Sequence, residues 1–393
     1  MGAKTQIIVL NGWAARPEAW NACAFSRDRI FSYIETLDGR AEEAVANAPD
    51  GVILVGWSMG GSAALELAAK FPDRIRGLVL LAATARMMAD VDWKGMNPLR
   101  CKALKRALLE GEPPEPNPYF IDTDVNLERG LDYLRTVDVR AALLSCAADG
   151  AFKFPVHIFQ GGQDAVTRPS NVEFLQQIFP KAKVTRLEKC THALPVEIPG
   201  AIDEAVMDVL KANIRREMRA VRKALPDTER LTHSHQICRG LLARADIQEA
   251  ITKRQSIAVY LASRWEIDLD EFISSVLAQG GKIVAPRWTG TDYDLAEIAA
   301  LDEEHLVAGP MGILEPRENL PRVASTSVGV WLVPGLAFTR DGRRLGYGGG
   351  WYDRLLADVS PRVPKLGIAY GFQVVNDLPH EAHDILLTGV VSS

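Results

Sequence analysis

The sequence predicts an α/β protein with two domains, and three observations support this prediction. The chain has 393 residues, which is too long for one ordinary domain and suits two domains of about 150 to 200 residues. Short apolar runs alternate with helical patterns in both halves, an order that predicts parallel strands joined by crossover helices. No Gly/Ser-rich or Pro-rich linker separates the halves. We place the boundary near residue 210, so that the predicted domains cover residues 1–210 and 211–393.

Four apolar runs in the first half are candidates for buried strands, and stretches with helical spacing such as SAALELAAKFP separate them. These runs are residues 7–10, 51–57, 77–83 and 155–162. Residues 86 to about 150 break the pattern with mixed charges and with the proline cluster EGEPPEPNP at 110–118. We expect this interval to be a helical lid that stands off the sheet.

One helical pattern crosses the predicted boundary. Apolar residues recur near the period of a helix face between Ala201 and Leu225, and Pro226 ends the pattern. A second series of apolar runs follows at 256–262, 281–288, 328–335, 365–370 and 385–391. This order predicts a second domain with a three-layer α/β/α arrangement and a mainly parallel sheet.

Composition excludes several classes of protein. The net charge of −5, with 47% hydrophobic and 24% charged residues, describes a globular protein without the basic surplus of a nucleic-acid-binding protein. The five cysteines lie far apart without a C-x-x-C pair, which predicts neither a disulfide framework nor a zinc site. No segment approaches the roughly 18 apolar residues of a membrane span. We therefore expect a cytoplasmic protein that binds neither nucleic acid nor a membrane.

The segment GWSMG at 56–60 has the pattern G-x-S-x-G between a predicted strand and a predicted helix. A serine on such a tight turn has crowded backbone neighbours, and glycines let the chain pass while Oγ points outward. The serine also needs a base and an acid to orient that base, which follow in the order Asp, then His. Asp164 and His192 each follow a further strand candidate in that order. The pattern predicts a triad with Ser58, although a helix-capping serine and a loop histidine would suit either residue alone.

Residues 5 to about 210 resemble the α/β-hydrolases, and among them the pimeloyl-ACP methyl ester carboxylesterases of biotin synthesis. The resembling segments are NGW (11–13), GWSMGG (56–61), DWKGMNP (92–98), LDYLRTVDVR (131–140) and GGQDAVTRP (161–169). The resemblance implies that Ser58 is the nucleophile, His192 the base and Asp164 the residue that orients it. It also implies an oxyanion hole formed by the backbone N–H groups of Trp13 and Met59. Asn11 departs from the family, where histidine is common, and this departure concerns the shape of the oxyanion loop.

The resemblance further implies an acyl carrier protein as partner, and such proteins are acidic. The basic run RCKALKR at 100–106, with Arg129, Arg135 and Arg140, could form a positive face for it. The same region carries the acidic residues Asp122, Asp124, Glu128, Asp132 and Asp138, so an ordinary solvated surface fits equally well. Two alternatives stay open for this domain, a general carboxylesterase for small esters and a non-catalytic docking module.

The segment GYGGGWYD at 346–353 has four glycines in five positions and ends on an acid. Successive N–H groups of such a loop can turn toward one concavity that suits phosphate oxygens. Arg343 and Arg344 can supply positive charge, and Asp353 offers a hard oxygen ligand for magnesium. The spacing is neither that of a P-loop nor that of a dinucleotide fingerprint. The segment predicts a nucleotide site, with a hairpin-like glycine turn as the alternative.

Residues 211–393 resemble the 5-formyltetrahydrofolate cyclo-ligases. The resemblance rests on KANIRREMRAVRKAL (211–225), YLASRWEID (260–268), GILEP (312–316), VPGLAFTRDGRRLGYGGGWYDR (333–354) and LPHEAHD (378–384). It implies ATP as co-substrate, Mg²⁺ as metal and a folate as substrate. The implied reaction converts 5-formyltetrahydrofolate and ATP into 5,10-methenyltetrahydrofolate, ADP and phosphate.

The same resemblance implies roles for individual residues. Lys211 and Arg215 would contact the ATP phosphates, Asp353 would hold Mg²⁺, and Leu261 and Glu266 would bind the pterin. The residues that would enclose the nucleotide and the folate edge are Arg344, Leu345, Gly346, Tyr347, Gly348, Gly349, Gly350, Trp351 and Tyr352.

Two positions depart from this family's pattern. Trp351 replaces a usual tyrosine, and Thr388 stands where some relatives have an aspartate that serves the metal. Neither departure removes a residue that the implied reaction needs. We predict a fused bifunctional enzyme, with a folate or nucleotide sensor as the alternative for the second half.

Overall fold

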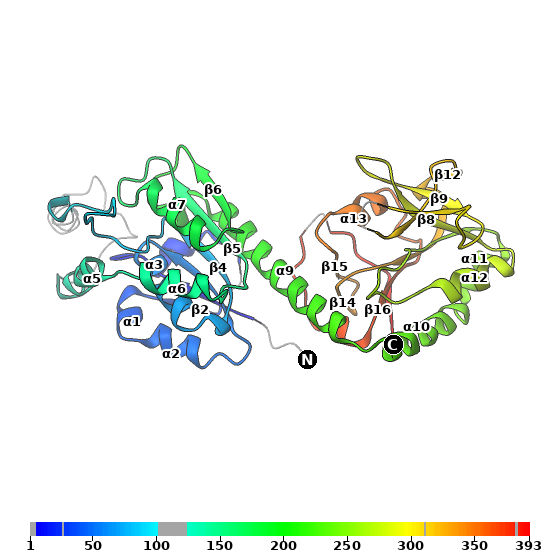
Figure 1. The fold of residues 1–393 in the computed structure, drawn as a ribbon, viewed down its shortest axis with the longest axis horizontal. Coiled ribbons are helices and arrows are strands. Elements are labelled where there is room, and N and C mark those ends of the chain that lie inside the picture. The colour runs from blue at the N-terminus through cyan, green and yellow to red at the C-terminus, as the bar shows by residue number, and fades with distance from the viewer. Residues whose placement is uncertain (1–4, 26, 101–123, 310–311, 382–383) are drawn as a thin grey trace. The chain divides into compact units, whose positions relative to one another are not determined.

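Figure 1 shows the computed structural model, which describes residues 5–25, 27–100, 124–309, 312–381 and 384–393. The described chain divides into two compact units between Asn213 and Ile214. This division falls inside helix α9 (Pro199–Ala224), close to the predicted boundary at residue 210. The proline cluster at 110–118 lies outside the described residues, as does the basic run at 100–106 apart from Arg100.

A parallel sheet of six strands forms the centre of the first unit, in the order β2-β1-β3-β4-β5-β6. Every neighbouring pair in it is parallel. The strands are β1 (Gln6–Leu10), β2 (Arg29–Phe31), β3 (Val52–Trp57), β4 (Ile75–Leu81), β5 (Val156–Gly161) and β6 (Lys183–Leu187). The four predicted apolar runs are β1, β3, β4 and β5. Strand β2 has three residues, which is too short for a periodic signal.

Helices cover both faces of this sheet. Because successive strand residues point to opposite faces, Ile8 and Leu10 enter one core and Ile7 and Val9 enter the other. The first core lies under α1 (Tyr33–Leu37), α2 (Arg40–Ala46), α3 (Met59–Lys70), α5 (Asp124–Thr136), α6 (Arg140–Ala148) and α7 (Pro169–Ile178). The second core lies under α8 (Leu194–Glu197) and the first half of α9.

The predicted lid interval contains α5 and α6 in its described part. Leu131 of α5 and Leu143 of α6 are fully buried in the first core. These two helices therefore pack against the first core, and the lid role of this interval stays a prediction. Burial of one leucine side chain contributes about 1.5 to 3 kcal/mol, which is ample reason for helices with apolar faces to pack in this way.

The second unit is built on a sheet of seven strands in the order β12-β9-β8-β7-β13-β16-β18. Its strands are β7 (Ser256–Ala258), β8 (Lys282–Trp288), β9 (Tyr293–Ile298), β12 (Arg322–Val323), β13 (Val328–Val333), β16 (Lys365–Ala369) and β18 (Gly389–Ser392). The pairs from β8 to β18 are parallel, and β9 and β12 add an antiparallel edge. The predicted mainly parallel α/β sheet is confirmed.

Two layers cover the second sheet. Val330 and Leu332 face a core under α10 (Asp227–Leu242), α11 (Ala245–Thr252) and α12 (Asp270–Ala278). Trp331 and Val333 face the opposite core, which contains Leu356 of α13 (Trp351–Leu356).

A smaller sheet has the order β15-β14-β17, and its strands β14 and β15 lead into the glycine-rich segment before α13. Its strands are β14 (Ala337–Thr339), β15 (Arg344–Leu345) and β17 (Val374–Val375). The strands β10 (Leu306–Ala308) and β11 (Leu314–Pro316) form a separate antiparallel pair. In the part of the chain that the structure describes, no helix combines the length and apolar character needed to cross a bilayer.

Candidate active sites

Ser58 occupies a strained turn between β3 and α3. Its φ and ψ are 56° and −117°, a left-handed conformation that costs a non-glycine residue about 1 to 3 kcal/mol. A Cβ on Gly56 would lie 2.6 Å from the Gly60 carbonyl oxygen, and a Cβ on Gly60 would lie 2.1 Å from that of Leu10. Only glycine fits at either position, which explains the G-x-S-x-G pattern.

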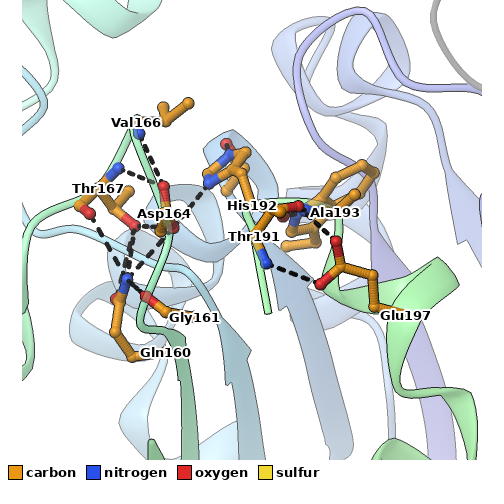
Figure 2. A network of polar contacts seen from close by, with 11 residues as sticks. Gln160, Gly161, Asp164, Val166, Thr167, Thr191, His192, Ala193 and Glu197 are labelled. Atoms are coloured by element: carbon orange, nitrogen blue, oxygen red, sulfur yellow. Dashed lines mark hydrogen bonds and ion pairs between the residues drawn. The ribbon is translucent and has the colours of Figure 1, made fainter. Parts of the chain in front are cut away.

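Ser58, His192 and Asp164 come together although they are far apart in the sequence. His192 Nε2 lies 2.8 Å from Ser58 Oγ, and His192 Nδ1 lies 2.9 Å from Asp164 Oδ2. The Asp164 side chain is fully buried and Ser58 is 8% exposed. Figure 2 shows the imidazole directed at the Asp164 carboxylate. The three side chains thus form one hydrogen-bonded chain with the order and geometry of a nucleophile, a base and an orienting acid.

The Asp164 carboxylate accepts several further hydrogen bonds (Figure 2). Oδ1 accepts from the backbone N–H groups of Val166 and Thr167, and Oδ2 accepts from Thr167 Oγ1 at 2.6 Å and from Gln160 Nε2 at 3.2 Å. Burial by itself raises the pKa of Asp164, but the hydrogen bonds from His192 and Thr167 outweigh it and lower the pKa below its ordinary value. The site therefore favours a charged carboxylate beside His192.

The His192 loop is held through its backbone by residues that the sequence did not single out. Trp57 Nε1 donates to the His192 carbonyl at 2.8 Å. On the preceding residue, both the N–H and the hydroxyl of Thr191 donate to Glu197, at 2.8 and 2.5 Å. A Cβ on Gly161 would lie 2.2 Å from the Thr191 carbonyl oxygen, so only glycine lets this loop pass the end of β5. No local sequence pattern predicts these roles of Trp57 and Glu197. The partner of Trp57 lies on another element, and the partner of Glu197 lies across a turn.

The loop after β1 carries the predicted oxyanion donors. Within the described residues, the amides of Trp13 and Met59 donate to no backbone acceptor, whereas the Ser58 amide donates to the Leu81 carbonyl. A Cβ on Gly12 would lie 3.5 Å from Ser58 Cβ. The loop therefore passes beside the serine, and the oxyanion role of the Trp13 amide stays a prediction.

Asn11 fixes the shape of this oxyanion loop. Its Oδ1 accepts from the Gly12 amide and from Trp20 Nε1, each at 3.1 Å, and its Nδ2 donates to the Ala15 carbonyl at 2.9 Å. The side chain is completely buried. The asparagine that replaces the family's histidine thus supplies three bonds that close the loop.

Three described arginines of the predicted carrier-binding face, Arg129, Arg135 and Arg140, are paired with acids. Arg129 lies 2.6 Å from Asp38, and Arg135 lies 3.0 Å from Asp132. Arg140 lies 2.8 Å from Asp138 and 3.1 Å from Asp90. The hydrogen bond from Arg140, followed by that from Arg86, holds the pKa of Asp138 far below its ordinary range. Of the two readings, the described residues favour a charge-balanced surface over a free positive face.

The glycine loop of the second unit is bordered by arginines of α9. Arg215 Nε donates to the Gly346 carbonyl at 3.0 Å, and Arg219 Nη2 donates to the Tyr347 carbonyl at 3.4 Å. Gly348 and Gly350 have φ of 106° and 65°, values that favour glycine. Lys211 is buried four residues before Arg215 on the same helix, on the first unit's side of the division.

Glu266 belongs to the same neighbourhood as the glycine loop. The Tyr347 hydroxyl donates to Glu266 Oε1, and the Ser263 amide donates to Oε2 at 2.8 Å. Burial, followed by the charge of Glu266, raises the pKa of Tyr347. Leu261 is buried in the core just after β7. The structure thus places one predicted pterin residue against the loop predicted to hold the nucleotide.

Asp353 is the residue predicted to hold magnesium. Its Oδ1 accepts a hydrogen bond from Arg344 at 2.9 Å, while Arg343 pairs with Asp377 and Asp341 on the outside of the turn. The Thr388 hydroxyl is bonded to the backbone of Lys365. The described residues contain no cluster of three or more His, Cys, Asp or Glu side chains. One carboxylate beside a loop that is predicted to bind phosphate would suit Mg²⁺ held mainly by nucleotide and water.

Trp351 packs in an aromatic cluster at the start of α13. Its ring lies 5.2 Å from those of Trp288 and Tyr293, and Arg354 stacks 4.3 Å from it. The tryptophan that replaces the family's tyrosine therefore gives up a hydroxyl and gains an edge-to-face contact with both rings. Tyr352, the next residue, lies under the Arg344 guanidinium.

Two family models match the chain. Residues 46–198 match the alpha/beta hydrolase fold, and residues 208–393 match the 5-formyltetrahydrofolate cyclo-ligase family. Among curated proteins, the pimeloyl-[acyl-carrier protein] methyl ester esterase of Nitrosomonas europaea is 25% identical over 247 residues, covering 50% of this chain and 92% of that protein. The protein of the same name from Salmonella newport is 25% identical over 253 residues, covering 53% and 94%.

Solved structures resemble each half in turn. The 5,10-methenyltetrahydrofolate synthetase of Aquifex aeolicus is 32% identical, with a TM-score of 0.42, and covers 47% of this chain and 89% of its own. A hydrolase from Pseudomonas aeruginosa is 20% identical, with a TM-score of 0.41, and covers 53% of this chain and 91% of its own.

Proposed function

Because the chain joins an α/β-hydrolase domain to a 5-formyltetrahydrofolate cyclo-ligase domain, we propose that it is a bifunctional enzyme. The first domain acts as a serine carboxylesterase on the methyl ester of pimeloyl-ACP. The second converts 5-formyltetrahydrofolate and ATP into 5,10-methenyltetrahydrofolate, ADP and phosphate. The hydrogen-bonded chain of Ser58, His192 and Asp164 carries the esterase assignment. The names of the curated relatives support the choice of ester.

The esterase reaction follows from the geometry around Ser58. Ser58 Oγ attacks the ester carbonyl while His192 Nε2, 2.8 Å away, takes its proton. The Trp13 and Met59 amides stabilise the negative oxygen, and Asp164 stabilises the imidazolium. His192 then protonates the departing methanol. Water, activated by the same imidazole, releases the acid and restores Ser58.

Hydrolysis of methyl pimeloyl-ACP by the purified chain tests this assignment. We expect free pimeloyl-ACP to form, and the Ser58→Ala variant to lose at least about 1,000-fold in rate. A chain that hydrolyses no ester and is not labelled by a fluorophosphonate would refute the esterase function.

The paired arginines favour a second candidate, an esterase for small esters that needs no carrier. Arg129, Arg135 and Arg140 each have an acidic partner, so the described surface offers little net positive charge to an acidic carrier. Equal kcat/KM for methyl pimelate and for the carrier-bound ester would support this candidate. A preference of tenfold or more for the carrier-bound ester would exclude it. Carrier binding without turnover, unchanged in Ser58→Ala, would indicate a docking module instead.

The cyclo-ligase reaction needs an activated formyl oxygen. The γ-phosphoryl group of ATP is transferred to that oxygen, which makes it a good leaving group, and N10 then attacks the formyl carbon as phosphate departs. We assign Arg215, Lys211 and the glycine loop to the ATP phosphates, and Leu261 and Glu266 to the pterin. The carboxylate of Glu266 can accept hydrogen bonds from the pterin's amino and ring N–H groups. Asp353 would hold Mg²⁺ together with the nucleotide, and the ion would supply positive charge beside the phosphates.

Formation of methenyltetrahydrofolate, followed by its absorbance, tests the second activity. We expect product only with ATP and folate together, and a loss of at least about 100-fold in kcat/KM for Arg215→Ala, because a charged phosphate contact is removed. Binding of both ligands without product would indicate a sensor and contradict the enzyme assignment.

A further inference from the structure

Tyr347 connects the glycine loop to Glu266 and to α9. Its hydroxyl donates to Glu266 Oε1 and accepts a hydrogen bond of 2.7 Å from Arg222 Nη1. The Arg222 side chain is only 5% exposed, and its Nε is fixed on the Trp265 carbonyl at 3.0 Å. The phenol is therefore engaged as donor and as acceptor at once, on two residues that the rest of the fold holds in place.

The backbone on either side of this phenol is held by other arginines of α9. Arg215 donates to the Gly346 carbonyl and Arg219 to the Tyr347 carbonyl. Both acceptors are neutral carbonyls, whereas a phosphate is an anion that can accept two parallel hydrogen bonds from one guanidinium. Nucleotide phosphates at this loop would therefore draw the guanidinium groups away from the loop carbonyls and release the segment that carries Tyr347.

Both carboxylate oxygens of Glu266 accept hydrogen bonds from the protein in this structure. Oε1 accepts from Tyr347 and Oε2 from the Ser263 amide. The Ser263 bond is local, since Ser263 precedes Glu266 in the same turn and the Glu266 amide donates back to its carbonyl. Tyr347 is the partner that can leave, because it lies on a glycine-rich loop and is 44% exposed.

We propose that Tyr347 couples the two substrate sites by competing with the pterin for Glu266. This inference rests on the proposed cyclo-ligase function. With the phenol in place, Oε1 is less available to a pterin N–H donor. Nucleotide binding withdraws the phenol and leaves this oxygen with the ion pair to Arg222, 3.8 Å away, as its remaining side-chain contact among the described residues, so it raises the affinity for folate. By thermodynamic reciprocity, folate must raise the affinity for nucleotide by the same factor.

Calorimetric titration of the full chain with 5-formyltetrahydrofolate tests the proposal, with and without a non-hydrolysable ATP analogue. For the natural chain we expect the analogue to tighten folate binding by about tenfold, within the usual range of coupling between sites. For Tyr347→Phe we expect tighter folate binding without the analogue, by a similar factor, and less than a twofold further effect of the analogue. A phenol with a merely structural role would make the same variant bind folate more weakly.

Tyr133→Phe is the matched control, since it also removes a phenol hydrogen-bonded to a glutamate, Glu66 at 3.1 Å, but in the first unit. Its folate binding and its coupling should equal those of the natural chain. Coupling that persists in Tyr347→Phe, or that is absent from the natural chain, would overturn the inference and leave the cyclo-ligase assignment standing. Failure of the natural chain to bind folate under either condition would contradict the proposed function itself.

Discussion

His192 is held through its backbone as well as through its ring. The ring lies between Ser58 and Asp164, while the Trp57 indole fixes the carbonyl of the same residue. Trp57 is the variable residue of the G-x-S-x-G pattern, so the turn that presents the nucleophile also orients the base. A misplacement of about 1 Å in such a pair can cost 100-fold in rate.

We therefore expect Trp57→Phe to lower the esterase kcat about five- to tenfold with little change in KM, because one hydrogen bond of about 1 kcal/mol that positions the base is lost. Trp93→Phe is the control, since it removes a similar bond, from Nε1 to the Arg86 carbonyl at 2.7 Å, away from the serine. The rate at which a fluorophosphonate labels Ser58 is to be measured for both variants. Equal rates for the two would show that the indole does not position His192.

A second histidine affects stability instead of catalysis. His157 is buried on β5, and its pKa is lowered from 6.5 to about 4, first by burial and then by the charge of Lys183. Between these two values the unfolded chain binds a proton that the folded chain does not, so the free energy of unfolding falls as the pH drops through this window.

The loss from His157 alone should reach about 2 kcal/mol at pH 5, relative to pH 8. His157→Gln should lose less stability over the same interval, because it cannot titrate. Thermal unfolding of both proteins across this pH range measures the difference. Parallel pH profiles would show that His157 does not titrate as described.

At the scale of elements, the strand–turn–helix unit of β3 and α3 shows how local geometry fixes the nucleophile. Gly60 lies on the first turn of α3, where the helix meets the end of β1. This contact between backbones positions both the serine and the loop that bears Trp13.

Gly60→Ala places a Cβ 2.1 Å from the Leu10 carbonyl oxygen, so we expect a loss of about 1 to 3 kcal/mol in stability and slower labelling of Ser58. Gly240→Ala, in the last turn of α10 with no atom within 4 Å of the new Cβ, should instead stabilise its domain, by up to about 0.5 to 1 kcal/mol. Melting temperatures of the two variants should move in opposite directions. A neutral Gly60→Ala would contradict the close packing of this turn.

At the scale of the whole molecule, the two units have separate cores. The apolar residues of α9 divide between them: Ile202, Val206 and Val209 pack in the first unit, and Ile214 and Met218 in the second. No core cluster of the described residues contains side chains from both units. Ser58, Asp164 and His192 lie in the first unit, and the glycine loop and Glu266 lie in the second.

Because the cores are separate, we expect each activity to survive loss of the other. Ser58→Ala should abolish ester hydrolysis and leave the cyclo-ligase rate within about twofold of that of the natural chain. Asp353→Asn should abolish the cyclo-ligase activity and leave the rate of ester hydrolysis within about twofold of that of the natural chain. Both rates can be measured in one preparation of each variant. A cyclo-ligase rate that depends on Ser58 would reveal a coupling between the domains that separate cores do not explain.

The sequence by itself determined the fold class, the two domains, the order Ser58, Asp164 and His192, and the glycine loop. These features depend on spacing along the chain, on apolar periodicity and on positions where only glycine fits, all of which are local. The sequence could not determine the support of His192 by Trp57, or the pairing of Arg129, Arg135 and Arg140 with acids.

The tertiary structure also decided the contact of Tyr347 with Glu266, two residues that are 81 positions apart. Each such contact depends on how strands and helices pack and on which way a side chain turns once they have packed. The spacing of residues along the chain specifies neither this packing nor the direction of the side chain.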